Sequence, residues 1–122
     1  MQILNGIPKL FEEELFSRYR EIERNFREHR WAPSELDGGK LCEAAYSILK
    51  GHVDGKFPPK PTKPKNFPLA CQDMEKAAPS YGHSIRILLP KMLIPLYDIR
   101  NHRGVGHIGG DVDPNHMDAV CV

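Results

Sequence analysis

The sequence has few cysteines, almost no net charge and no long apolar segment. Three cysteines, Cys42, Cys71 and Cys121, form neither a metal knuckle nor a Cys-x-x-Cys pair, which predicts reduced, partly buried thiols. The formal net charge of +1 excludes binding of nucleic acid through overall charge, so any RNA contact must depend on a local basic cluster. The longest strongly apolar stretch, 85–96, contains two charged residues and two prolines and is too short to span a bilayer. The N-terminus lacks a signal-peptide pattern, so we expect a cytoplasmic protein.

The alternation of apolar and polar residues that is typical of strands is also missing, as are internal repeats. Apolar residues instead recur every three or four positions, which predicts an all-α fold. The 122 residues, 40% of them hydrophobic, suffice for one core, so we expect residues 1–122 to form a single helical domain. Near the end, Met117, Val120 and Cys121 begin a further apolar pattern. Either the last helix is very short or the sequence is a piece of a longer chain.

The first helix is predicted over residues 7–30. One face of it gathers the apolar residues, which are Phe11, Leu15, Tyr19, Ile22 and Phe26. Pro8 is tolerated in the first turn. Because proline disfavours the α conformation at the preceding residue, Pro33 is expected to follow the end of this helix.

The second helix is predicted over residues 39–52. Its buried face comprises Leu41, Ala44, Ala45, Ile48 and Leu49. Glycine in a helix interior costs conformational entropy, so Gly38 and Gly39 are placed at or before the start of this helix. Gly51 and Gly55 are predicted to stop it.

Two further helices are predicted in the second half. Asn66 can cap a short helix over 67–78, with Pro68 in its first turn. A helix over 84–101 is apolar on more than one side, which predicts that it is the central buried element. Pro90 and Pro95 each remove an intrahelical hydrogen bond, so we expect them to kink or split it.

Residues 53–65 are predicted to be a loop. Four prolines hold it extended, and its lysines make it the most basic stretch of the chain. One interpretation is a solvated, semi-rigid connector. The other is an arm whose lysines, Lys60, Lys63 and Lys65, touch an RNA backbone.

The segment 98–110 carries the residues suited to chemistry. Directly after the most apolar helix it places, within eight residues, Arg100, Asn101, His102, Arg103 and His107. Glycines at 104, 106, 109 and 110 allow the backbone to turn tightly and to approach other groups closely. Polar groups at the end of a core are costly unless they bond to something, which makes this segment a candidate site.

Arg100 is followed by six residues and then His107, with the polar Asn101 directly after the arginine. This spacing resembles the Arg-x4-6-His motif of the HEPN superfamily, and the glycines around it resemble the abortive-infection branch. Residues 33–43 are similar to a helix start in such domains, and the resemblance spans roughly 35–118. One departure is the absence of a tyrosine shortly after His107, which argues against regulation through a modified tyrosine.

The resemblance implies an antiparallel bundle of four to five helices with a Pro/Lys-rich loop. It also implies a homodimer with a shared cleft that acts as an endoribonuclease without a metal or other cofactor. The expected context is a bacterial toxin or phage-defence system, with an antitoxin or a larger defence complex as partner and no membrane association.

The residues by themselves support RNA chemistry. Histidine transfers protons near neutral pH, and arginine holds two phosphate oxygens at once. We therefore assign phosphate binding to Arg100, proton transfer to His107, an orienting role to Asn101, and further RNA contacts to His102 and Arg103. On a continuous helix the two catalytic candidates lie about 10.5 Å apart along the axis, too far to grip one phosphate. A break at the glycines, or a dimer, must bring them together.

Other interpretations of the same residues stay open. Arg100 suits the C-terminal dipole of a helix, Asn101 suits a helix cap, and His107 suits a packed histidine bonded to a carbonyl. A metal cluster would have to use His102, His107, Asp111, Asp113 and His116, but no pair has clear ligand spacing, so no metal is predicted. The alternative function is a non-catalytic HEPN module that binds RNA, a nucleotide or a partner protein in a larger assembly. A third is a structural helical domain whose glycines merely reverse the chain.

Overall fold

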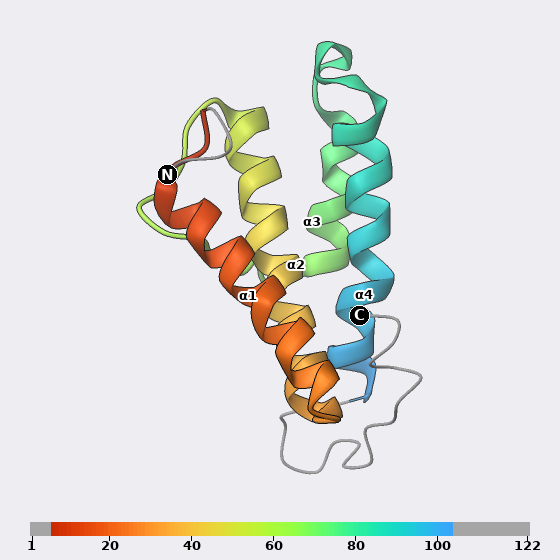
Figure 1. Ribbon diagram of the computed structural model, residues 1–122. Coiled ribbons are helices and arrows are strands. Elements are labelled where there is room, and N and C mark those ends of the chain that lie inside the picture. The colour runs from red at the N-terminus through yellow and green to blue at the C-terminus, as the bar shows by residue number, and fades with distance from the viewer. Residues whose placement is uncertain (1–5, 104–122) are drawn as a thin grey trace.

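A computed structural model describes residues 6–103, with the backbone alone at positions 32, 34, 35, 79 and 100–103. This range contains four α-helices and no strand, which confirms the predicted all-α fold (Figure 1). The helices are α1 (Lys9–Arg27), α2 (Trp31–Asp54), α3 (Phe67–Asp73) and α4 (Leu89–Arg103). Two 3-10 turns, Met74–Lys76 and Pro79–Tyr81, and a π-helical turn, Ser84–Leu88, join α3 to α4.

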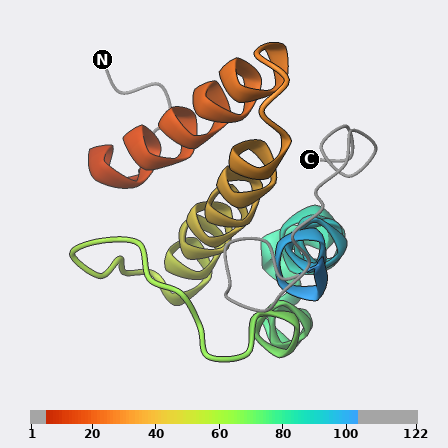
Figure 2. The ribbon, with the colours of Figure 1, turned by 90° about the horizontal axis from the view of Figure 1, so that it is seen from below.

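The central helix is α2, with α1 on one side and α3 and α4 on the other (Figure 2). Both α1 and α4 run antiparallel to α2. The prediction that 84–101 is the central buried element is therefore wrong. Leu88, at the end of the π-helical turn, and Leu89 and Met92 of α4 are between 42% and 61% exposed, because only one side of this segment packs against neighbouring helices. When a helix has apolar residues on all sides, its sequence does not indicate which side packs against other helices.

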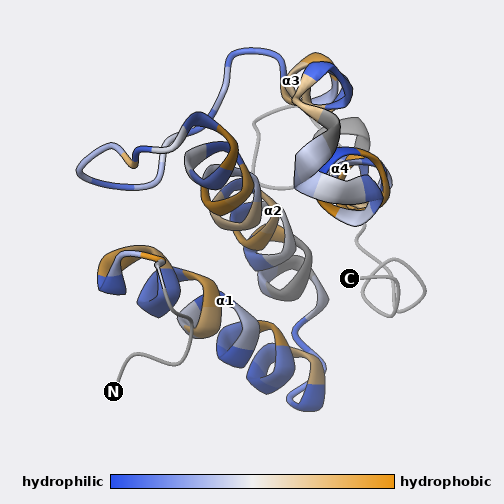
Figure 3. Cartoon of the chain, turned by 90° about the horizontal axis from the view of Figure 1, so that it is seen from above, coloured by the Kyte–Doolittle hydropathy of each residue, from blue (hydrophilic) through white to orange (hydrophobic). Residues whose placement is uncertain are grey.

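The main core lies between α2, α3 and α4. Its buried side chains are Cys42, Tyr46, Phe67, Cys71, Met74 and Tyr97. Apolar segments of α1 and α2 also face each other, whereas the outer side of α1 is hydrophilic (Figure 3). Of the apolar face predicted for the first helix, Phe11 and Ile22 are buried, but Tyr19 is 55% exposed.

The turn between α1 and α2 corrects the predicted start of the second helix. His29 adopts a left-handed conformation with φ of 60°, and Arg30 N–H donates to the Asn25 carbonyl over 2.8 Å, so α1 closes with a Schellman-type cap. The stacked rings of His29 and Trp31 lie 5.2 Å apart, and α2 begins at Trp31 rather than at 39. Pro33 falls in its first turn, where backbone N–H groups need no helical partner.

Gly38 and Gly39 are consequently buried inside α2, so their predicted position at or before the helix start is wrong. Packing contributes more than the entropy that two glycines cost. Gly55 caps the end of α2 with φ of 78°, as predicted. Gly51 does not stop the helix; it is buried in the last turns of α2, against the ring of Phe57.

The shorter helices follow their predicted signals more closely. The Asn66 side chain accepts a hydrogen bond from Leu69 N–H over 3.1 Å, which confirms the predicted cap of α3. The helix ends at Asp73 and continues as a 3-10 turn, so the predicted end at 78 is too late. Pro90 lies at the start of α4, directly after the π-helical turn, whereas Pro95 lies within α4. A change of helix type thus precedes Pro90, in line with the predicted split.

The contact between Gly51 and Phe57 gives a stability prediction. A Cβ at position 51 would lie 2.9 Å from Phe57 Cγ and closer still to two other ring atoms. We expect Gly51→Ala to lower the free energy of unfolding by about 1–3 kcal/mol, as overpacking does, measured by urea denaturation. The double variant Gly51→Ala/Phe57→Ala is the control, because removing the ring relieves the clash. If the loss of unfolding free energy in the double variant equals the sum of the losses in the two single variants, this account is wrong.

The two described thiols give a pH prediction. Burial raises the pKa of Cys42 to about 12 and that of Cys71 to about 11. Between the ordinary thiol pKa and these values the native state keeps protons that the unfolded chain has lost. Their contribution is complete below pH about 9. As the pH rises further, it decreases by up to about 1.4 kcal/mol per pH unit for each thiol. In the variant Cys42→Ala/Cys71→Ala, the free energy of unfolding should therefore decrease less above pH about 9 than in the parent, as measured by urea denaturation at a series of pH values. If the variant and the parent show the same pH dependence, the prediction is wrong.

Candidate functional site

The sequence-predicted site begins on the last turn of α4. The backbone is helical from Leu89 through Arg103, so Arg100, Asn101, His102 and Arg103 occupy consecutive positions at its end. Their side chains lie outside the described part of the structure, and so does all of His107.

The position of this helix end is fixed three residues earlier. Tyr97 is 2% exposed, and its ring stacks on that of Phe67 at a centroid distance of 4.1 Å. Its hydroxyl donates to Glu43 Oε2 over 2.7 Å. Three residues correspond to about 4.5 Å along a helix, so Arg100 follows this anchor by roughly one turn. Tyr97 therefore holds the end of α4 against α2 and α3.

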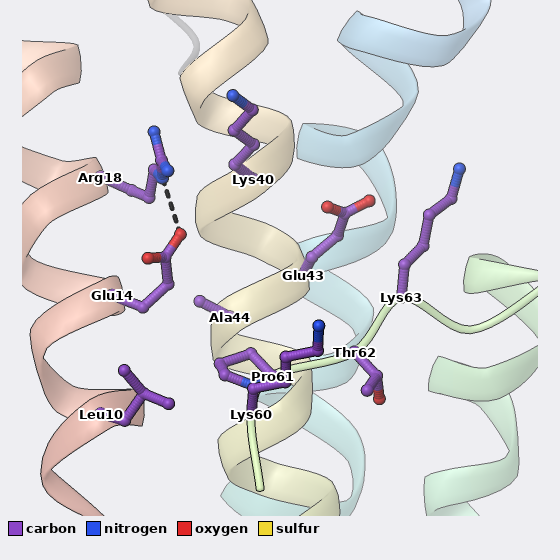
Figure 4. Close-up of a pocket in the computed structure, with 10 residues that line it drawn as sticks. All are labelled: Leu10, Glu14, Arg18, Lys40, Glu43, Ala44, Lys60, Pro61, Thr62 and Lys63. Atoms are coloured by element: carbon purple, nitrogen blue, oxygen red, sulfur yellow. Dashed lines mark hydrogen bonds and ion pairs between the residues drawn. The ribbon is translucent and has the colours of Figure 1, made fainter.

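A groove of about 450 Å³ lies between α1, α2 and the loop that follows α2 (Figure 4). We call it the basic groove. Its lining residues are Leu10, Glu14, Arg18, Lys40, Glu43, Ala44, Lys60, Pro61, Thr62 and Lys63. Four of them are cationic and two are carboxylates. Glu43 belongs both to this groove and to the Tyr97 anchor, so the groove and the motif-bearing helix meet at one residue.

The loop is fastened to α2 at two places. The buried Ser47 hydroxyl accepts a hydrogen bond from Thr62 N–H over 3.1 Å and lies 3.0 Å from the Thr62 carbonyl oxygen, to which it can donate. Phe57 packs edge-on against Phe11, with ring centroids 5.2 Å apart, and against Gly51. Four prolines stiffen the loop between and beyond these points. The backbone that carries Lys60 and Lys63 is therefore held against α2.

Both carboxylates of the basic groove already have partners. Glu14 Oε1 accepts from Arg18 Nε over 2.8 Å, and Arg18 Nη1 donates to Asp37 Oδ1 over 3.2 Å. The hydrogen bond that Arg18 donates to Glu14 raises the pKa of Arg18, which stays charged at any physiological pH. The buried Asn25 also donates to Asp37, over 3.3 Å. This network ties α1 to α2, and two of its members, Glu14 and Arg18, line the groove.

The structure brings together only some of the predicted RNA-binding residues. Lys60 and Lys63 line the basic groove, whereas Lys65 is exposed outside its lining. Sequence reasoning missed Lys40, which lines the groove from α2, and the partners Ser47 and Glu43. The helical spacing of Lys40 and Glu43, three residues apart, was the only available signal for this shared face.

Metal-binding clusters and membrane-spanning helices are both absent from the described part of the chain. Among residues 6–103 no group of three or more histidine, cysteine, aspartate or glutamate side chains is placed to hold a metal ion. The metal cluster considered from the sequence falls outside the described side chains. No described helix is long and apolar enough to cross a membrane.

Comparisons with known proteins identify no relative: no family model, curated protein or solved structure matches this chain.

Proposed function

We propose that this protein is a metal-independent endoribonuclease of the HEPN type, acting in the cytoplasm in a bacterial toxin or phage-defence system. The Arg100–Arg103 turn carries the first half of the Arg-x6-His motif. The observation that supports the proposal most is the position of this turn. The turn ends the helix that Tyr97 attaches to Glu43. Glu43 in turn lines a groove whose three lysines have no ion pair among residues 6–103.

In the proposed reaction the ribose 2′-hydroxyl attacks the adjacent phosphorus. Arg100 binds the non-bridging oxygens, where negative charge develops in the transition state. His107 takes or delivers the proton, and Asn101 orients one of the two side chains. The bond from phosphorus to the 5′-oxygen breaks, which leaves a 2′,3′-cyclic phosphate on one product and a 5′-hydroxyl on the other. DNA lacks the attacking group and stays intact.

A homodimer is part of the proposal. Along an unbroken helix Arg100 and His107 would be about 10.5 Å apart, which exceeds the reach of two groups acting on one phosphate. A second protomer that places its motif opposite the first supplies the missing partner across a shared cleft.

The test is an incubation of purified protein with a single-stranded RNA and with the DNA of the same sequence. We expect cleavage of the RNA alone, no loss of activity in EDTA, and products that carry cyclic phosphate ends by mass spectrometry. RNA that remains intact over a range of pH and protein concentration would contradict the proposal.

A second candidate is a non-catalytic module that binds a partner protein. It is favoured by the exposed apolar side of α4 and by an adjoining apolar groove of about 150 Å³. The groove is lined by Leu15, Ala45, Ile48, Leu49, Leu89 and Leu93. Analytical ultracentrifugation distinguishes the candidates: a monomer without nuclease activity indicates the module, and a dimer that cuts RNA indicates the enzyme.

A further inference from the structure

We propose that the basic groove binds the phosphate backbone of single-stranded RNA at a site separate from the cleavage motif. The inference rests on the proposed function for its choice of ligand, since it names where the substrate is held before it is cut. It adds Lys40 to the RNA-binding residues and excludes Lys65 from the groove.

The first argument is charge. Lys40, Lys60 and Lys63 all line the groove, with their ammonium groups spread along it (Figure 4), and among the described residues none of them has an ion pair. Both carboxylates of the lining are engaged, Glu14 with Arg18 and Glu43 with Tyr97. Arg18 balances the charge of Glu14, but Glu43 stays negative when a hydroxyl donates to it. The four cations and two carboxylates of the lining therefore leave a local charge of +2 in a chain whose net charge is only +1. Such a site attracts a polyanion.

The second argument is preorganisation. Two of the three lysines flank Pro61 and Thr62, and Ser47 holds Thr62 by its backbone. Prolines on both sides reduce the backbone entropy that the loop would lose when a ligand binds. A purely solvated connector would not require that a buried serine of α2 hold it at Thr62, near its middle.

The third argument is the shape and chemistry of the lining. A volume of about 450 Å³ lies within the range of small-ligand pockets, so one or two nucleotide units fit. Leu10, Ala44 and Pro61 provide an apolar floor, and the lining contains no aromatic ring on which a base could stack. The groove is therefore suited to the backbone of a strand and not to base recognition. Little sequence preference should result.

The fourth argument is the route to the motif. Glu43 lies on the groove and receives the Tyr97 hydroxyl bond, and Arg100 follows Tyr97 by about one helical turn. A strand that leaves the groove past Glu43 meets the end of α4. The groove can thus retain one part of an RNA while a neighbouring part is cut.

The experiment measures binding of a fluorescent 12-nucleotide single-stranded RNA by anisotropy, in an Arg100→Ala/His107→Ala background that prevents cleavage. Lys40→Ala/Lys60→Ala/Lys63→Ala should weaken binding at least tenfold and make the salt dependence shallower by about two units of log–log slope. The matched control, Lys50→Ala/Lys76→Ala/Lys91→Ala, removes the same charge elsewhere and should change the affinity less than threefold. Ser47→Ala keeps every charge, and because it releases the loop it should weaken binding two- to fivefold. Single-stranded DNA should bind about as well as RNA.

The outcomes separate this inference from the proposed function. Binding that both triple variants weaken equally, no binding by the parent, or equal binding of poly-glutamate would overturn the groove assignment. Cleavage by the motif-intact protein is measured independently, and there the groove variant should raise KM while leaving kcat unchanged. A protein that binds RNA through the groove but never cuts it would refute the nuclease and leave the groove in place. A circular dichroism melt of each variant excludes unfolding as the cause.

Discussion

Arg100→Ala and His107→Ala are each expected to lower the rate constant of RNA cleavage at least 100-fold. General acid–base catalysis contributes about 100- to 10,000-fold, and a cation that stabilises transition-state charge contributes a similar factor. The double variant should be little slower than either single variant, because the two groups act as a unit. The measurement is single-turnover cleavage of a labelled RNA with enzyme in excess.

The controls for this prediction are chosen outside the motif. His83→Ala and Arg20→Ala remove an exposed histidine and an exposed arginine and should retain full activity. If the site combines Arg100 of one protomer with His107 of the other, mixing the two single variants should restore about one quarter of the parent rate. Random exchange makes half of the dimers mixed, and each mixed dimer has one intact site. Activity in the double variant equal to the parent's would refute the assigned roles.

The largest effect on stability is expected for Tyr97→Ala. The side chain is 2% exposed, stacks on Phe67 and donates a hydrogen bond to Glu43. Removing a large buried aromatic ring costs about 3–5 kcal/mol, and stacking adds to the loss. The variant should therefore lose most of the unfolding free energy of a small domain, measured by urea denaturation.

Tyr97→Phe isolates the hydroxyl group from the ring. It leaves the stacking in place but removes the donor to Glu43, so a loss of about 1–2 kcal/mol is expected. Because Glu43 lies on the basic groove, the same variant should also change RNA affinity, whereas Tyr19→Ala, at a 55% exposed position, should change neither quantity. A Tyr97→Ala protein as stable as the parent would show that α4 is not anchored through this residue.

The boundaries of the helices show how much of the fold can be predicted from the sequence. Local signals placed the cap at Asn66 and the stop at Gly55, because each acts through its own backbone and its nearest neighbours. The start of α2 was missed by eight residues. There a local preference against glycine in a helix is outweighed by burial of Gly38 and Gly39, which depends on helices distant in the sequence.

The candidate sites differ in the same way. The Arg-x6-His motif can be recognised from the sequence because its members are close along the chain. The basic groove could not be, because Lys40 and Lys63 line the same groove only after the loop folds back along α2. The path of the loop is fixed by the hydrogen bond between Thr62 and Ser47, and the spacing of residues in the sequence does not reveal this contact.

The sequence by itself determined that the chain is helical, where its loop is stiff, and which side chains are of the type suited to binding phosphate and transferring protons. These properties follow from periodicity, proline and side-chain type, each of which acts over a few residues. Only the tertiary structure decided that α2 is the central helix, that Tyr97 anchors the motif-bearing end of α4, and that three lysines share one groove. The physical reason is that burial and pairing depend on contacts between segments far apart in the chain, which local preferences do not specify.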